Sequence, residues 1–273
     1  EGAPGLAKTT AIRALAARLK ADFARVQFTP DLLPADLTGT EVWRPQEGRF
    51  EFQPGPIFHP VLLADEINRA PAKVQSALLE AMGERQVTVG RHTYPLPPLF
   101  LVMATQNPIE QEGTYPLPEA QLDRFLMEVD VDYPDIEAER KILFDTTGAE
   151  ETRAKAAMTS DDLIAAQRLV RRLPVGESVM EAILKLVRSA RPGPEAGDLG
   201  KLISWGPGPR ASQALMLAVR ARALLEGRFA PSVDDVLELA EPVLKHRMAL
   251  TFAARAEGET VPNVIGRLKT RIG

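Results

Sequence analysis

The sequence predicts an α/β core with a parallel sheet, followed by an all-α domain. Two continuous apolar runs, Val61–Ala64 and Leu99–Ala104, lack the alternation of half-exposed strands and are typical of strands buried on both faces. Helical periodicity separates such runs in the first part of the chain, as expected for a parallel sheet covered by helices. Only helical periodicity recurs later. We therefore expect an α/β core over residues 1–150 and a helical domain over residues 151–273.

The first part of the chain alternates helices and strands in a regular order. Ile12, Leu15 and Leu19 share one face of the first helical run, which extends from Lys8 to Ala21. The elements expected after it are strands over 26–29, 61–64, 99–104 and 125–131 and a helix over 72–82. Because helices separate strands in this pattern, we expect the strands to pair in parallel.

Two short insertions interrupt this alternation. One runs from Glu41 to Phe52 around a turn at residues 46–48, and the other joins residues 86–89 to 92–94 through a Gly-Arg turn. Residues that favour strands on both sides of a glycine turn predict hairpins. On one interpretation they are plain surface hairpins, and on the other they project toward a substrate or a pore.

The second part of the chain has the pattern of helices separated by proline-rich breaks. Ser160-Asp161-Asp162 is a helix cap, and the helix after it runs to Arg172. Further helices are expected over 176–191, 209–226, 232–245 and 261–272. His246-Arg247 lies near the end of one of them, where we expect either a solvated role or one that complements the helix dipole.

Composition excludes several classes of protein. Of the 273 residues 45% are hydrophobic, enough for a full core, yet no run of about eighteen apolar residues could span a membrane. Cysteine is absent, which excludes disulfides and thiolate metal sites and fits a cytoplasmic protein. The net charge of −4 argues against strong nonspecific binding to nucleic acid. His59, His92 and His246 are too scattered to form a metal site.

A glycine-containing loop precedes the first helix. Backbone N–H groups of such a loop can surround phosphates, and the positive end of the following helix points at them. Lys8 is expected to neutralise β- and γ-phosphate charge, and Thr9 to offer its hydroxyl to Mg²⁺. The expected phosphate-binding residues are Gly2, Ala3, Pro4, Gly5, Leu6, Ala7, Lys8, Thr9 and Thr10. The alternative is a chance glycine loop before a helix.

Two carboxylates, Asp65 and Glu66, follow the buried run at residues 61–64. At the tip of a strand, Asp65 can hold Mg²⁺ through water, and Glu66 can polarise an attacking water. The alternative is an acidic cap of a following helix. With the loop upstream, the pair predicts a nucleoside-triphosphate hydrolase of the P-loop type.

Three further residues are candidates for the same reaction. Asn107 follows the next buried strand and could orient the attacking water, although Asn-Pro is also a common turn. Arg124 precedes the strand expected over 125–131, and Arg210 opens a helix. Arginine stabilises the charge that develops in phosphoryl transfer and can come from a neighbouring subunit. Alternatively, either arginine forms a surface salt bridge, and Asp123 could pair with Arg124.

Together these residues resemble the AAA+ ATPases, and more narrowly the MoxR family, over essentially the whole chain. The strings that carry the resemblance are EGAPGLAKT at 1–9, LADEINRAP at 63–71, ATQNP at 104–108 and GTYPLPEAQLDRF at 113–125. The resemblance implies ATP and Mg²⁺ as ligands, a helical lid as the second domain, and two hairpins that match insertions of this clade. The site residues it implies are Walker A at 2–9, Walker B at Asp65-Glu66, sensor 1 at Asn107, an arginine finger at Arg124 and sensor 2 at Arg210.

The resemblance also implies partners and one missing element. Family members are chaperone-like machines that form rings, here expected to be hexameric, and often work with a von Willebrand factor A domain protein on a client protein. Their usual role is the maturation of other proteins or their loading with metal cofactors. The family carries a helix and a strand before the P-loop, whereas this sequence starts at Glu1. We therefore expect the sheet to lack that strand and the activity of this fragment to depend on it.

Three other functions stay open on the sequence alone. An ATPase subunit of a metal-chelatase shares the strings and insertions, and only a chelatase partner would separate the two. A nucleic-acid motor with the same core would show ATP turnover that DNA or RNA stimulates. A non-catalytic scaffold would bind nucleotide without turnover until the upstream strand is added.

Overall fold

The computed structural model describes residues 1–2, 6, 8–106, 114–147 and 154–272. The chain forms two compact units. The N-terminal unit consists of Glu1–Leu117 and Asp130–Ile164, and the C-terminal unit consists of Pro118–Val129 and Ala165–Gly273. Residues 118–129 therefore pack with the C-terminal helices, whereas the sequence analysis divided the chain at residue 150.

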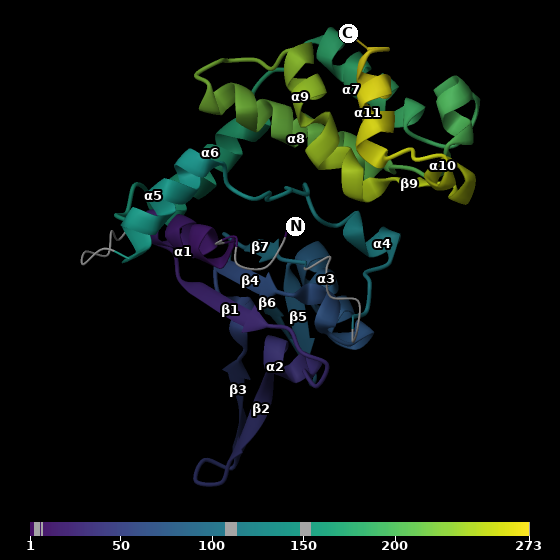
Figure 1. Cartoon of the computed structure of the whole chain (residues 1–273). Coiled ribbons are helices and arrows are strands. Elements are labelled where there is room, and N and C mark those ends of the chain that lie inside the picture. The colour runs from purple at the N-terminus through teal and green to yellow at the C-terminus, as the bar shows by residue number, and fades with distance from the viewer. Residues whose placement is uncertain (3–5, 7, 107–113, 148–153, 273) are drawn as a thin grey trace. The chain divides into compact units, whose positions relative to one another are not determined.

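A parallel sheet organises the N-terminal unit, as the sequence predicted. Its strands are β1 (Phe23–Gln27), β4 (Val61–Asp65) and β7 (Leu101–Ala104), which pair in parallel in the order β1-β4-β7 (Figure 1). Every residue of β4 is buried, which explains why its sequence shows no polar alternation. Helix α1 (Lys8–Arg18) packs against β4. Helix α3 (Ala72–Glu84) follows β4 in the chain.

The strand predicted over residues 125–131 does not form. A strand needs a partner for its backbone hydrogen bonds, and none of the described strands pairs with this segment. Instead, the N–H of Val131 donates to the carbonyl oxygen of Glu1 at 2.7 Å. Helix α5 (Ile136–Thr147) was not predicted, and Ile136, Leu143 and Phe144 on it are exposed. Without a buried face, it gave no clear helical pattern in the sequence.

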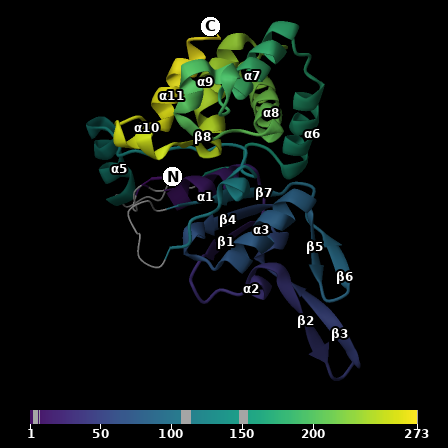
Figure 2. The same cartoon turned by 90° about the vertical axis from the view of Figure 1, so that its right-hand side faces the viewer.

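Both predicted hairpins form. They are β2 (Gly39–Arg44) with β3 (Arg49–Pro54), and β5 (Gln86–Val89) with β6 (His92–Pro95). The hairpins lie side by side (Figure 2), and the short helix α2 (Pro34–Thr38) precedes the first of them.

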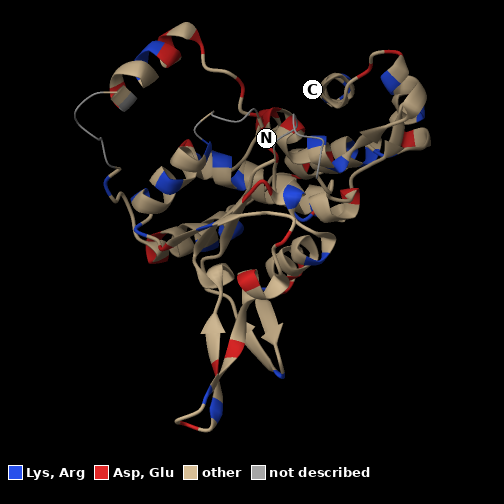
Figure 3. Ribbon diagram, turned by 60° about the horizontal axis from the view of Figure 1, so that its bottom comes forward, with Lys and Arg blue, Asp and Glu red and all other residues tan. Residues whose placement is uncertain are grey.

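Aromatic and charged side chains join the two hairpins. The ring of Phe52 stacks on that of Tyr94, with centroids 3.9 Å apart. His92 Nδ1 lies 3.4 Å from a carboxylate oxygen of Glu41. At the tip of the longer hairpin, Trp43 and Phe50 are exposed and residues of both charge signs occur (Figure 3). The two hairpins therefore form one joined element.

One hydrophobic core holds the helices of the C-terminal unit together. Ile183, Leu186, Leu215 and Val243 are among its fully buried members. Its helices are α4 (Glu119–Leu122), α7 (Glu177–Ser189), α8 (Pro209–Leu225), α9 (Val233–Leu244), α10 (Phe252–Ala256) and α11 (Val261–Lys269), while α6 (Ser160–Arg172) contains the boundary between the units. A short antiparallel pair, β8 (Ile203–Trp205) and β9 (Ala249–Leu250), interrupts the expected all-α pattern. Among the described helices, none is long and apolar enough to cross a membrane.

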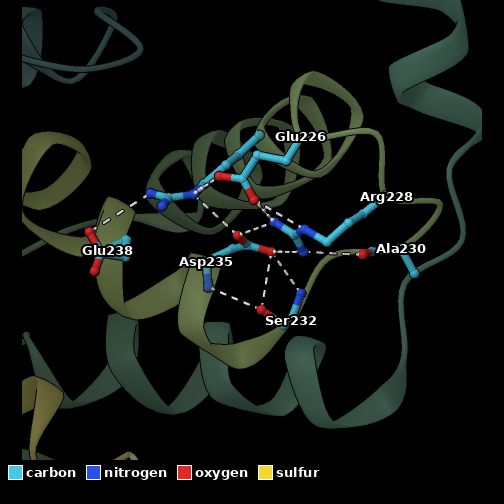
Figure 4. A network of polar contacts seen from close by, with 7 residues as sticks. Glu226, Arg228, Ala230, Ser232, Asp235 and Glu238 are labelled. Carbon is cyan, nitrogen blue, oxygen red and sulfur yellow. Dashed lines mark hydrogen bonds and ion pairs between the residues drawn. The ribbon is translucent and has the colours of Figure 1, made fainter.

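A buried carboxylate fixes the turn between α8 and α9 (Figure 4). Asp235, whose side chain is 4% exposed, accepts hydrogen bonds from both terminal nitrogens of Arg228 at 2.6 and 2.8 Å. The backbone N–H of Ser232 donates to the same carboxylate at 2.8 Å, and Arg222 Nε lies 3.3 Å from it. Hydrogen bonds from Arg228 are the main cause that lowers the pKa of the Asp235 carboxyl. The carboxylate therefore caps α9 and, together with Glu226, balances the charges of Arg222 and Arg228.

We expect Asp235→Ala to lower the free energy of unfolding by about 3 kcal/mol, because it leaves a charged cluster without its central anion. Asp234 is the matched control, since it lies in the same first turn of α9 and is exposed. Asp234→Ala should cost less than about 1 kcal/mol, the usual value of an acidic residue near a helix start. Urea denaturation of both variants measures the difference, and equal losses would contradict the role given to Asp235.

Candidate functional site

The carboxyl end of β4 carries Asp65, which side chains from the two neighbouring strands hold in place. Asp65 is 8% exposed, and its Oδ1 accepts a hydrogen bond from Thr105 Oγ1 at 2.5 Å. Its Oδ2 accepts from Arg25 Nε at 2.9 Å and Arg25 Nη2 at 2.6 Å. Arg25 lies on β1, and Thr105 directly follows β7. Because parallel strands end at the same edge of a sheet, these residues meet where such folds bind ligands.

Glu66 follows Asp65 in a left-handed backbone conformation, with φ 56° and ψ 51°. For a residue other than glycine this conformation costs on the order of 1 kcal/mol or more. The N–H of Glu66 donates to Thr105 Oγ1 at 2.9 Å, and its Oε2 accepts from Gln27 at 2.8 Å and Arg69 at 3.0 Å. These contacts offset the cost and fix the second carboxylate beside the first.

The residues that hold the two carboxylates were not predicted from the sequence. Arg25 and Gln27 stand two positions apart on β1, so they share one face of that strand. β1 pairs with β4 in a register that sets Gln27 opposite Asp65. A pair of polar residues with this spacing on a strand next to an acidic strand end is the signal that could have identified them. Thr105 could have been found from its position directly after a buried strand.

The phosphate-binding loop is only partly within the described residues. Ala3, Pro4, Gly5 and Ala7 lie outside them, as does the predicted catalytic residue Asn107. Helix α1 begins at Lys8, as predicted, and also contains Thr9 and Thr10.

Two described residues of this loop show how it is held. The Lys8 ammonium donates to the carbonyl oxygen of Gly2. Gly2 has φ +152°, and a Cβ added there would lie 2.3 Å from the carbonyl oxygen of Val131. Only glycine therefore fits at this first position of the loop.

The described donors suit a magnesium–phosphate ligand. Asp65 supplies carboxylate oxygens and Thr9 a hydroxyl, the hard oxygen ligands that Mg²⁺ prefers. Lys8 supplies a positive charge in the first turn of α1, where the helix dipole also favours anions. Asp65 and Thr9 therefore have the oxygen donors that Mg²⁺ needs, and Lys8 has the positive charge that a phosphate needs.

The two predicted arginines belong to the C-terminal unit. Arg210 is the second residue of α8, and its Nη1 lies 3.6 Å from Asp123 Oδ2. Arg124 directly follows Asp123 in the chain. The other oxygen of Asp123 accepts a hydrogen bond from Arg247 Nε at 2.9 Å. Asp123 is thus adjacent in sequence to one predicted arginine and ion-paired with the other.

His246 and Arg247 are buried, which corrects the solvated role expected from the sequence. Their side chains contact segment 123–126, more than a hundred positions earlier in the chain, and no local pattern reports such a contact. The carbonyl oxygen of Phe125 is the acceptor for His246 Nε2 at 3.1 Å, so Nε2 carries the proton of a neutral imidazole. Burial, and secondly the charge of Arg247, lower the pKa of His246 to about 4.

We expect Thr105→Val to lower the free energy of unfolding by about 1–3 kcal/mol. The change keeps the shape of the side chain but removes the donor to Asp65 and the acceptor for the N–H of Glu66. Thr105→Ser is the control, because it keeps the hydroxyl, and it should cost less than about 1 kcal/mol. Denaturant titration compares the two, and a valine variant as stable as the serine variant would contradict the prediction.

We expect the stability of the protein to fall as pH drops from about 6.5 to about 4, partly because of His246. The unfolded chain takes up a proton near pH 6.5, whereas the folded chain resists until about pH 4. The stabilisation is therefore complete above pH 6.5 and is lost toward pH 4, by about 3 kcal/mol. Urea titrations of the native chain and His246→Gln should diverge over this range. Parallel curves would show that His246 does not titrate as described.

Comparison with known proteins identifies relatives of the chain. The family model for ATPases associated with various cellular activities (AAA) matches residues 1–127, and the AAA lid domain matches residues 200–267. The chain is 44% identical to the chaperone MoxR1 of Mycobacterium tuberculosis, with 98% of this chain and 71% of that protein covered. It is 35% identical to the protein MoxR of Paracoccus denitrificans, with 97% and 83% covered.

A solved structure supports the fold as a whole. The crystal structure of a proposed ATPase from Cytophaga hutchinsonii matches 100% of this chain and 83% of its own, with 40% identity and a TM-score of 0.91. The predicted combination of a parallel-sheet AAA+ core and a helical lid is therefore confirmed. With the acidic end of β4 and these relatives taken together, the chain belongs to the MoxR family of AAA+ ATPases.

Proposed function

We propose that this protein binds ATP with Mg²⁺, hydrolyses it, and uses the turnover to remodel or mature partner proteins. The observation that carries the proposal is the pair Asp65-Glu66, held at the end of β4 by Arg25, Gln27 and Thr105. A preorganised carboxylate pair at a sheet edge is what phosphoryl transfer to water requires. The chaperone-like part of the proposal rests on the similarity to the chaperone MoxR1 alone.

Each site residue has a role in this proposal. Lys8 neutralises β- and γ-phosphate charge, Thr9 and Asp65 hold Mg²⁺, and Glu66 polarises the attacking water. Mg²⁺ would supply positive charge against the oxygens that become more negative during the reaction. Asn107 orients the same water. The remaining loop residues from Gly2 to Thr10, except Pro4, would surround the phosphates with backbone N–H groups.

Assembly completes the proposed site. We assign Arg124 to the arginine finger, supplied to a neighbouring subunit, and Arg210 to sensor 2 of its own subunit. Such an arrangement requires a ring, which we propose to be a hexamer of this chain. A von Willebrand factor A domain protein and a client protein are the proposed partners, and the cytoplasm is the proposed location.

We expect Glu66→Gln to lower ATP turnover by about 100-fold or more, because an amide cannot accept the proton of the attacking water. ATP binding should be unchanged, since the loop and Asp65 remain. Glu84→Gln is the matched control, because Glu84 is exposed at the end of α3. Steady-state phosphate release and fluorescent-nucleotide titration measure the two quantities. Equal turnover in the Glu66 and Glu84 variants would refute the role of Glu66.

The same variant tests the remodelling part of the proposal. Held in its ATP state, Glu66→Gln should retain a partner protein that the native chain releases after turnover. Pull-down with ATP and with ADP compares the two states. Capture that does not depend on the nucleotide would contradict a remodelling cycle.

A further inference from the structure

Two adjacent buried side chains hold segment 123–126 of the C-terminal unit. Arg247 Nη2 donates to the carbonyl oxygen of Asp123 at 3.1 Å and also to that of Phe125. Arg247 Nη1 donates to the carbonyl oxygen of Leu126 at 3.1 Å. Arg247 Nε donates to the Asp123 carboxylate, and His246 Nε2 donates to the Phe125 carbonyl. Three of the four main-chain carbonyls of this segment, at 123, 125 and 126, thus accept hydrogen bonds from Arg247.

We call the Arg247 guanidinium and its hydrogen bonds to the carbonyl oxygens of residues 123, 125 and 126 the clamp. An arginine side chain is needed for these contacts. Arg247 is 2% exposed, and a buried guanidinium is tolerated only when its donors are satisfied. Its planar fork offers five N–H donors in a fixed geometry, whereas a lysine ammonium offers three from a single point. The acceptors are mainly backbone carbonyls, so the side chain determines the path of the main chain there.

No apolar side chain of this segment is fully buried. Helix α4 ends at Leu122, and residues 123–129 form neither helix nor strand. Leu126 is 49% exposed and Val129 58% exposed. Beyond the clamp, Glu128 is anchored by its N–H to the carbonyl oxygen of Pro242 at 2.8 Å. Polar contacts from the end of α9 and the turn after it therefore give the segment its conformation.

The clamp reaches both predicted arginines. Arg124 lies between two residues whose carbonyls Arg247 binds, so that guanidinium holds the main chain on both sides of Arg124. Arg210 pairs with the Asp123 carboxylate, and the same carboxylate accepts from Arg247. One buried residue thus contacts the surroundings of both.

We propose that Arg247 is a positioning residue that sets the orientation of Arg124 and Arg210 for phosphoryl transfer, an inference that rests on the proposed ATPase function. It does not touch the nucleotide in this proposal. It acts through the main chain of residues 123–126 and through the Asp123 carboxylate.

The test compares Arg247→Lys and Arg247→Met in the full chain with Arg267→Lys as the matched control. Arg267 lies on the same unit and pairs with Glu259 at the surface. In both Arg247 variants kcat for ATP should fall by about tenfold or more while KM changes by less than about twofold, the pattern of a lost transition-state contact. The lysine variant keeps the positive charge but loses the planar fork of donors. It therefore tests the effect of donor geometry alone, even if the methionine variant does not fold.

A second measurement reports on the segment without relying on activity. Hydrogen exchange of the amides at 123–128 should speed up by about tenfold in the Arg247 variants, while exchange in α8 and α9 stays close to the native rate. Arg124→Ala should lower kcat without changing exchange. In that background, Arg247→Lys should reduce kcat by a smaller factor than in the native chain, because the two residues act in one path.

The outcomes separate the inference from the function on which it rests. Unchanged exchange would overturn the clamp, and faster exchange with unchanged kcat would overturn its positioning role. A raised KM with unchanged kcat would also overturn it. A native chain that binds ATP but never hydrolyses it would refute the proposed function, whereas the exchange rates would still decide whether Arg247 holds the segment.

Discussion

A buried carboxylate at the end of a buried strand is the constraint on which the site depends. Asp65 cannot lie at the tip of β4 unless its oxygens are hydrogen-bonded, because an unpaired charge there costs several kcal/mol. The strand order β1-β4-β7 meets this need, since it brings Arg25 and Thr105 to either side of it. The same threonine accepts the N–H of Glu66 and so makes its left-handed backbone tenable. The sheet order therefore determines both which side chains bind Asp65 and which group stabilises the backbone of Glu66.

The C-terminal unit solves a similar problem with the charges reversed. There the buried charged group is the guanidinium of Arg247. The Asp123 carboxylate balances its charge, and backbone carbonyls accept hydrogen bonds from its N–H groups. His246 stays neutral beside it because burial and the neighbouring positive charge both oppose protonation. Each unit thus orders its own charged groups by contacts within itself. Asp65 and Glu66 belong to the N-terminal unit, and the predicted arginines belong to the C-terminal unit.

Local patterns predicted much of the fold, but contacts distant in sequence decided the rest. β4 was found because it is buried along its whole length, and α9 forms within the helix predicted over 232–245. Residues 125–131 are as apolar as a strand, yet a strand also needs a neighbour, which hydrophobicity does not report. Asp65 and Glu66 were identified from their position, whereas Arg25 was missed because its partner lies forty positions away. Arg247 was misjudged for the same reason.

The stacked rings of Phe52 and Tyr94 have a mechanical consequence. Helix α3 starts just after the turn that follows Glu66, and β5 starts two residues after its end. With 13 residues at about 1.5 Å each, α3 is a stiff rod of roughly 20 Å. Since the two hairpins contact each other, any displacement of α3 would move both of them together. The exposed aromatic tip at Trp43 and Phe50 is therefore carried by both hairpins together and not by the longer one alone.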